Sequence, residues 1–347
     1  MQTDHSGPAA WRGPEMAARD DWLYHFSETD IAELEAAVAG VRGRGLDLID
    51  VTRADFPLPR LGAVLADIQE DVVHGRGFAH LRGLPVGRWS RLESALAYWG
   101  IGRHFGDPVS QNAQGHLLGH VRDVGKDPLD PVTRIYQTSY RQPYHTDSSD
   151  IVGLLCLQTP KSGGASRIVS STTIYDELER RRPDLLAVLG EPFVIDRKDE
   201  IPAGEGPHYS IPLFYRHADC VTVFYVRDFI EAALRFDDVP RLTPIQIEAL
   251  DAVDALAADP AVHLEIAFEP GDIQFLHNHQ ILHARTAYED HPEPGRRRHL
   301  LRLWLSAPNG RELPPAFRDR YGEIAVGKLR GGIQVPGATL GAPLEAD

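Results

Sequence analysis

The chain has 347 residues, enough for one large domain or two ordinary ones, and its hydrophobic and charged fractions of 42% and 25% are globular averages. A formal net charge of −14 repels nucleic acid and anionic membranes, and no apolar run is long enough to cross a bilayer. We therefore expect a globular protein whose partner is a small molecule, with neither nucleic-acid nor membrane binding and with homo-oligomer formation left open.

The N-terminal end carries no basic segment followed by an apolar stretch, which is what a secretory signal requires. We therefore expect a cytoplasmic protein. Cys156 lies in an apolar strand and Cys220 beside a polar turn, so both are interpreted as buried thiols rather than as a disulfide or a zinc site.

Residues 1–76 are predicted to form an arm and helices that pack on a core. The first 26 or so residues are rich in Pro and Gly, with Trp11 and Trp22 as anchors. Ser27 caps a helix that we expect to end near Gly40, and a second helix is expected from about Leu61 to Val73, before Gly75.

The catalytic domain is predicted to span residues 77–310 and to begin with a strand at 77–85. Ser90 opens a capping box for the next helix. The polar stretch from 108 to 144 is long for a loop, so we assign part of it to an active-site rim, with Gln137, Tyr140 and Arg141 as substrate contacts.

The motif His145-Thr146-Asp147 follows the rim and precedes the buried strand pattern 151–157. Two imidazoles and one carboxylate on one face of a metal leave three positions open, the arrangement of mononuclear non-haem Fe(II) enzymes. The chain also contains His217-Ala218-Asp219, which we interpret as a turn between strands, and His291-Pro292-Glu293.

A helical insert is expected at about 226–260, with Thr243 as its cap. The turn 270–272 then starts a strand that leads to His277, His279 and His283. If this strand continued, alternation would put all three imidazoles on one face, so the residue pattern leaves the third ligand open.

The run 296–302 contains four arginines. Arg296 and Arg297 are interpreted as a solvated strand end, whereas Arg298 and Arg302 lie in an apolar run and need an anionic partner when buried. That partner is either a bound ligand or a structural carboxylate such as Asp150. The tail 311–347 is rich in Gly and Pro, and we expect it to pack loosely.

The chain resembles the taurine dioxygenase (TauD/TfdA) family of Fe(II)- and 2-oxoglutarate-dependent oxygenases, in the wider clavaminate-synthase-like superfamily. The resemblance covers roughly residues 77–306 and selects His283, five residues after Asn278, as the third ligand. The matching motifs are His145-Thr146-Asp147, Gly163-Gly164-Ala165-Ser166, Gly271-Asp272, Asn278 with His283, and Arg298 with Arg302.

This resemblance implies a mainly β fold with flanking helices, a distorted double-stranded β-helix or jelly roll. It implies Fe(II) held by His145, Asp147 and His283, with 2-oxoglutarate and dioxygen as co-substrates. Arg298 and Ser166 would bind the distal carboxylate of 2-oxoglutarate, and Arg302 an anionic substrate.

The implied reaction is oxidation of an unactivated C–H bond, by default hydroxylation, with release of succinate and CO2. The expected substrate is a small organic acid, an amino acid or a specialised metabolite. Two alternatives remain open: a cupin-like hydrolase or isomerase that does not use 2-oxoglutarate, and a non-catalytic sensor on the same barrel.

Overall fold

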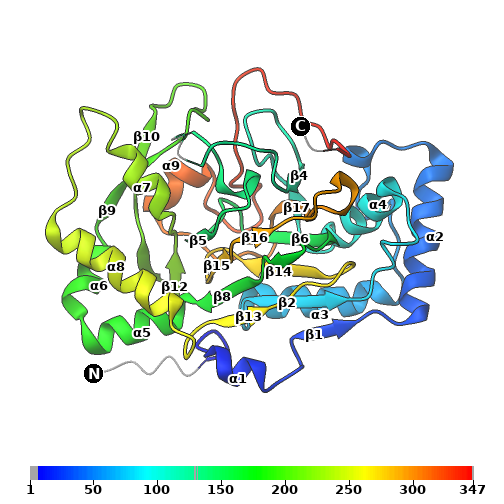
Figure 1. Ribbon diagram of the computed structural model, residues 1–347, viewed down its shortest axis with the longest axis horizontal. Helices are drawn as coiled ribbons and strands as arrows, with labels where there is room; N and C mark the ends of the chain where they lie inside the picture. Colours follow the sequence, from blue (N-terminus) through cyan, green and yellow to red (C-terminus); the bar gives the residue numbers. More distant parts are fainter. Residues whose placement is uncertain (1–6, 129, 131, 346–347) are drawn as a thin grey trace.

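The computed structural model describes residues 7–128, 130 and 132–345, and it is mainly β with helices at both ends (Figure 1). The largest sheet has seven strands, six of them in the order β1-β2-β14-β6-β17-β3, with β4 also paired to β17. Its strands are β1 (Leu23–His25), β2 (Phe78–Arg82), β3 (Asp107–Pro108), β4 (Leu118–Val121), β6 (Ile151–Gln158), β14 (Ile273–His277) and β17 (His299–Ser306).

A second sheet of four strands has the order β13-β8-β15-β5. These strands are β5 (Gln142–His145), β8 (Ser166–Ser170), β13 (Leu264–Ile266) and β15 (Ile281–Arg285). Three antiparallel pairs complete the described strands: β9 (Pro192–Asp196) with β10 (His208–Pro212), β11 (Phe214–His217) with β12 (Cys220–Val223), and β7 (Ser162–Gly163) with β16 (Tyr288–Glu289).

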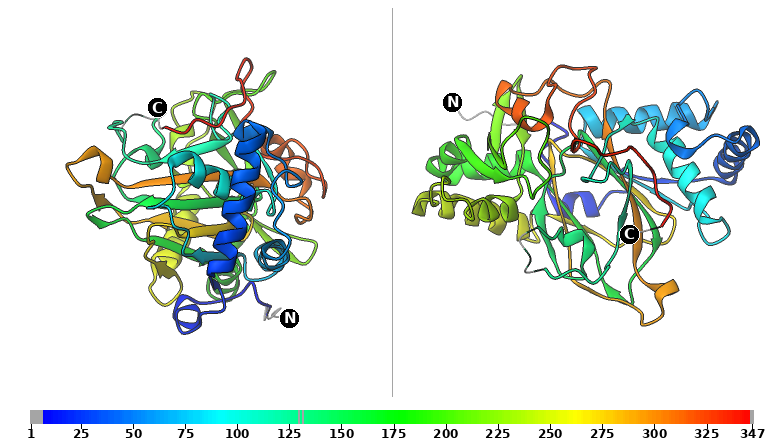
Figure 2. Two further views of the ribbon diagram at one scale, coloured as in Figure 1. Left: turned by 90° about the vertical axis from the view of Figure 1, so that its right-hand side faces the viewer. Right: turned by 90° about the horizontal axis from the view of Figure 1, so that it is seen from above.

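Helices flank the sheets at opposite ends of the molecule (Figure 2). One end holds α2 (Glu28–Arg44), α3 (Leu61–His74) and α4 (Arg91–Gly102); the other holds α5 (Ser171–Arg181), α6 (Pro183–Leu189), α7 (Arg227–Ala233) and α8 (Pro244–Ala258). The short helices are α1 (Gly13–Ala17), α9 (Arg318–Tyr321), η1 (Leu48–Asp50), η2 (Ile135–Gln137), η3 (Pro294–Arg296) and η4 (Pro315–Phe317). Each end has its own apolar cluster, and strand residues pack into both clusters.

The helix starts follow the local sequence signals. Capping boxes are present at Ser27, Ser90 and Thr243, so each hydroxyl satisfies an amide of its helix's first turn. The predicted end of α2 at Gly40 was wrong, because the helix continues to Arg44. Gly45 has φ 65, the left-handed conformation that favours glycine at a helix C-terminus.

One strand prediction also needs correction. The segment from 273 to 283 is two strands: β14 ends at His277 and pairs with β6 in the large sheet, whereas β15 pairs with β5 and β8 in the second sheet. The chain thus changes sheets between His277 and Ile281. His277, His279 and His283 therefore do not share one strand face.

The C-terminal tail packs closely, contrary to the expectation. Arg330 is 2% exposed and donates to both oxygens of Asp150, at 2.9 and 3.0 Å. Further along, Gly341 exchanges backbone hydrogen bonds with Gly115 and Leu117. Gly341 thus lies beside the segment that leads into β4 of the large sheet, so parts of the tail are fixed on the core rather than forming a loose extension.

Other sequence expectations are confirmed. Trp11 is buried against Phe78, and the 217–219 segment turns between β11 and β12. Cys156 is a buried free thiol, as expected, whereas Cys220 is a free thiol that is only partly buried. Within the described ranges, no helix is long and apolar enough to cross a membrane. The prediction that residues 1–8 form no secretory signal falls mostly on residues 1–6, which lie outside the described residues.

Asp272 ties the start of β14 to β2. Its carboxylate accepts hydrogen bonds from Arg82 at 2.8 and 2.9 Å and contacts His80 Nε2 at 2.9 Å. Burial alone would raise the pKa of Asp272, but the hydrogen bonds from His80 and Arg82 outweigh it and lower the pKa to about 2. The ionised carboxylate therefore stabilises the folded state.

We expect Asp272→Asn to lower the free energy of unfolding by about 3 kcal/mol at pH 7, since it leaves Arg82 without its buried partner. Because the folded-state pKa is depressed, this advantage of the wild type is present above the ordinary aspartate pKa of about 3.9 and is lost as pH falls toward 2. Urea unfolding at several pH values measures the difference. Glu269→Gln, at an exposed partner of Arg82, is the control, and equal losses in the two variants would contradict the assignment.

Candidate active site

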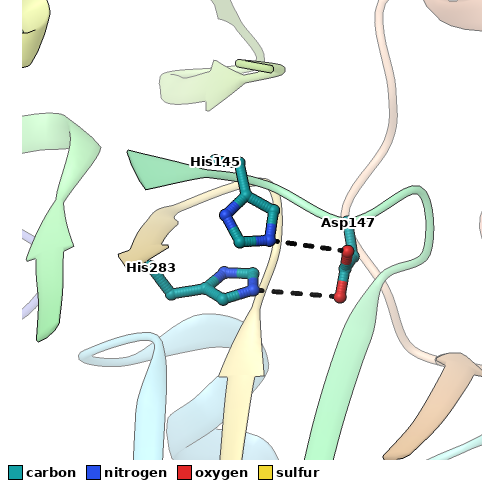
Figure 3. A group of neighbouring side chains, drawn as sticks. All are labelled: His145, Asp147 and His283. Carbon is teal, nitrogen blue, oxygen red and sulfur yellow. Dashed lines mark ion pairs between the residues drawn. The ribbon is translucent and has the colours of Figure 1, made fainter. Parts of the chain in front are cut away.

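His145, Asp147 and His283 come together at the junction of β5 and β15 (Figure 3). One potential ligand atom of each lies within 4.8 Å of the others. The Nε2 atoms of His145 and His283 face separate oxygens of Asp147, at 3.9 and 3.8 Å. In the register of the second sheet His283 lies directly opposite His145, so strand pairing brings the distant histidine to the motif.

Backbone and side-chain contacts hold the motif in place. Asn278 Oδ1 accepts from the Asp147 amide at 3.0 Å, and the indole N–H of Trp304 donates to Asp147 Oδ2 at 2.9 Å. The Nδ1 atom of His145 lies 2.9 Å from the Pro143 carbonyl. A proton on Nδ1 would leave the Nε2 lone pair directed at the centre of the group, as a metal ligand requires.

The electrostatics of the site favour a neutral imidazole at His283 and an ionised carboxylate at Asp147. Burial and the neighbouring His145 lower the pKa of His283 to about 3, against the opposing effect of Asp147. For Asp147, burial would raise the pKa, but Arg302 and His283 outweigh burial and lower it. Near neutral pH His283 is thus neutral and Asp147 ionised, the protonation states that bind a divalent metal.

His277 and His279 lie in a different buried network. His279 Nε2 contacts Asp150 at 2.9 Å, and Arg311 approaches His277 Nδ1 at 3.3 Å. Asp150 is therefore engaged with His279 and Arg330. The alternative in which Asp150 is the structural partner of Arg298 or Arg302 was wrong.

A small cavity of about 40 Å³ adjoins the triad and is lined by Ser166, Arg298 and Arg302. Arg298 is 5% exposed, and its guanidinium lies over the ring of Tyr288. The Nη1 atom of Arg298 has no hydrogen-bond partner in the part of the chain described. Burial lowers the pKa of Arg298. A buried guanidinium nitrogen without a partner is costly, so this position suits an anionic ligand.

Ser166 is less free than the sequence suggested. Its hydroxyl donates to Gln274 Oε1 at 2.9 Å, while Gln274 Nε2 is buried without a partner among the described residues. Sequence reasoning missed Gln274, although a glutamine in the apolar run of β14 was a usable signal, since buried amides need partners. The Ser166–Gln274 pair presents one unused amide donor.

A larger cavity of about 860 Å³ opens beside the triad. Its lining includes His145, Asp147, Tyr140 and Arg141 but, among the described residues, not Gln137, which ends η2. Tyr140 is 60% exposed and lies at the rim. The structure thus brings two of the three proposed rim contacts to this cavity.

Arg302 stands between the two cavities, which it lines in common with His145 and Asp147. Its Nη1 lies 3.7 Å from Asp147 Oδ2, and its Nε donates to Gln111 Oε1 at 2.7 Å. Gln142, whose Nε2 lies 2.9 Å from His145 Nε2, is a second site residue that the sequence did not indicate. Only the fold reveals Gln111 and Gln142, because neither the loop around Gln111 nor the short strand that Gln142 begins carries a pattern that marks a site.

Comparison with known proteins gives a consistent result. The family model described as "Taurine catabolism dioxygenase TauD, TfdA family" matches residues 43–304. The FR-33289 synthase of Streptomyces rubellomurinus (strain ATCC 31215) is 33% identical over 331 residues, covering 93% of this chain and 96% of that protein.

Two solved structures share the fold. Asparagine oxygenase in complex with Fe(II), 2S,3S-3-hydroxyasparagine and succinate has a TM-score of 0.64 at 17% identity, over 82% of this chain and 93% of that one. The non-haem iron oxygenase OrfP in complex with Fe and alpha-ketoglutaric acid has a TM-score of 0.61 at 17% identity, over 82% and 94%.

The two-sheet geometry predicts which histidine matters for metal. We expect His283→Ala to reduce the affinity for Fe(II) or Co(II) by at least about tenfold, while His279→Ala keeps metal affinity and loses stability instead. Anaerobic calorimetric titration and thermal unfolding separate the two effects. Metal binding that survives His283→Ala and disappears in His279→Ala would reverse the assignment.

Proposed function

The chain belongs to the TauD, TfdA family and is an Fe(II)- and 2-oxoglutarate-dependent dioxygenase, and we propose that it hydroxylates a small anionic substrate in the cavity beside His145 and Asp147. The observation that carries the proposal is the convergence of His145, Asp147 and His283 next to the buried Arg298, whose Nη1 has no hydrogen-bond partner among the described residues. We further propose that the two sheets form a distorted double-stranded β-helix, and that the free thiols reflect a reducing, cytoplasmic location.

The three proposed ligands fit Fe(II). Neutral imidazoles suit this metal, and a single carboxylate leaves a residual positive charge that attracts an anionic chelate. When bound, the iron would supply the redox chemistry that couples conversion of 2-oxoglutarate to succinate and CO2 with hydroxylation of the substrate. The Trp304 indole fixes one oxygen of Asp147, which keeps that carboxylate from rotating away.

The lining of the small cavity supports its assignment to the co-substrate. Arg298 would bind the distal carboxylate of 2-oxoglutarate through its unused Nη1, and the planar guanidinium matches a carboxylate better than an ammonium does. The Ser166–Gln274 pair would add a donor from the neighbouring strands. Tyr288 covers the Arg298 guanidinium at 5.1 Å and limits its contact with water.

The substrate is proposed to enter through the larger cavity. Arg302 would orient an anionic group beside Asp147. Tyr140 and Arg141 would contact the substrate at the rim of the cavity, whose lining does not include Gln137. The neighbours whose structures contain 3-hydroxyasparagine or (3S)-hydroxy-L-Arg support an amino-acid-like or related organic acid.

We expect Arg298→Lys to weaken 2-oxoglutarate binding by about 1.5–3 kcal/mol, because the charge remains but the bidentate fork is lost. The readout is the charge-transfer band that 2-oxoglutarate produces on Fe(II) without oxygen, titrated with co-substrate. Arg297→Lys, the adjacent substitution, is the matched control and should titrate like the wild type. An unchanged titration in Arg298→Lys would move the carboxylate site elsewhere.

Arg302→Gln should leave that band intact while the KM for an acidic substrate rises by about tenfold or more, since a charge-assisted bond is removed. Succinate release with and without substrate measures the effect. Loss of the band itself would place Arg302 in the co-substrate site.

A further inference from the structure

Three arginines on one wall of the larger cavity have no role in the chemistry described so far. Arg134 precedes η2, Arg197 follows β9, and Arg320 lies in α9, yet all three line the cavity that contains His145 and Asp147. The chain has a net charge of −14, so its surface is acidic overall. A general basic surface therefore does not explain why three arginines gather inside this cavity.

Each guanidinium is held by protein contacts. Arg320 Nε donates to Ser148 Oγ at 2.8 Å, and its Nη1 donates to the Gly332 carbonyl at 2.9 Å. Arg197 lies over the ring of Tyr209 at 4.6 Å, and Arg134 lies over that of Phe229 at 4.7 Å. The cluster is therefore preorganised, which lowers the entropy cost of binding a ligand.

Acidic groups neutralise only part of this charge. Arg134 pairs with Glu200, and Arg197 Nη2 donates to Glu205 at 3.2 Å. Arg320 pairs with no carboxylate in the described ranges. Lys198 also lines the cavity, as does Asp228 nearer His145. Asp319 also lines the cavity and attracts Arg197, so the charge left without a carboxylate partner among the described residues is that of Arg320.

One member of the cluster, Arg197, is buried, whereas Arg134 and Arg320 are partly exposed. The Arg197 side chain is 4% exposed, and its Nε is buried without a partner among the described residues. Burial lowers the pKa of Arg134 to about 10, and the nearby guanidiniums of Arg302 and Arg320 contribute to this decrease. Buried like charges destabilise one another unless an anion lies between them.

We propose that Arg134, Arg197 and Arg320 bind a dianionic tetrahedral oxyanion, the phosphate ester or phosphonate group of the substrate. A phosphate group offers three strong acceptor oxygens, which matches three guanidinium forks better than a planar carboxylate does. Tyr209, whose pKa burial raises to about 12, keeps its hydroxyl proton beside the same arginines as a further donor.

This site would set the position of the reacting carbon, and it rests on the proposed function for that role. Arg320 is anchored on Ser148, the residue after Asp147, so the oxyanion site and the metal carboxylate belong to one short segment. A substrate held at its charged end would extend along the cavity toward His145. Arg302 would then contact a second polar group near the iron.

The test is anaerobic calorimetric titration of the protein loaded with Fe(II) and 2-oxoglutarate. The probes are phenyl phosphate, phenylphosphonate, phenyl sulfate and benzoate. We expect the two dianions to bind about tenfold more tightly than the two monoanions, and the tighter of the two dianions identifies a phosphate ester or a phosphonate. Arg197→Gln and Arg320→Gln should each weaken dianion binding by about tenfold or more.

Arg241→Gln, an exposed arginine outside this cavity, is the charge-matched control and should bind as the wild type does. If a glutamine variant unfolds, Arg320→Lys retains charge and should show an intermediate affinity. Equal affinity for phenyl phosphate and benzoate, or dianion binding unchanged in Arg320→Gln because the ligand sits on the metal, would overturn the proposal.

The charge-transfer band separates this inference from the proposed function. A wild-type protein that forms the band but does not prefer dianions contradicts only the oxyanion site. A protein that forms no band but binds phenyl phosphate in an Arg320-dependent manner supports the oxyanion site and contradicts the dioxygenase function.

Discussion

The buried carboxylate of Asp147 is the constraint around which the site is built. An ionised carboxylate away from water is destabilising unless donors and cations surround it, and here the Trp304 indole and the Arg302 guanidinium approach it from β17. Asn278, from the turn before β15, fixes its backbone. Three segments distant in sequence must therefore pack correctly before this charge is tolerated, and the same packing produces a preorganised metal site.

Asp150 is a second buried charge close to Asp147 in the chain, and its contacts stabilise the segments that form the site. Asp150 accepts from Arg330 and contacts His279, so it joins the C-terminal tail to the turn between β14 and β15. This turn is where the chain leaves the large sheet and enters the second one. The network thus fixes the crossing that places His283 opposite His145, and it gives the close packing of the tail a structural reason.

Charge is distributed unevenly between surface and interior. The chain carries a net charge of −14, yet the two cavities beside the triad are lined by several arginines. These are Arg298 and Arg302, together with the proposed oxyanion-binding residues Arg134, Arg197 and Arg320. The guanidiniums among these lining residues attract small anions, although carboxylates such as Glu200, Glu205 and Asp319 line the same cavity. This arrangement is consistent with two anionic ligands, a co-substrate and a substrate, held on different sides of one metal.

The sequence alone determined the elements whose signals are local. Capping boxes at Ser27, Ser90 and Thr243 predicted helix starts because a hydroxyl three residues from its amide partner is a short-range interaction. The end of α2 was misjudged, since glycine is tolerated within a helix and Gly45, rather than Gly40, adopts the left-handed conformation. Family resemblance, rather than periodicity, singled out His283.

Only the tertiary structure decided what the long-range contacts do. It put His283 on the second sheet, His277 on the large sheet and His279 in the turn between them, and it assigned Asp150 to Arg330 rather than to Arg298 or Arg302. It also assembled Arg134, Arg197 and Arg320 from three segments that share no motif. The physical reason is that charge pairing and cavity shape depend on distance in space, which the spacing of residues along a chain does not encode.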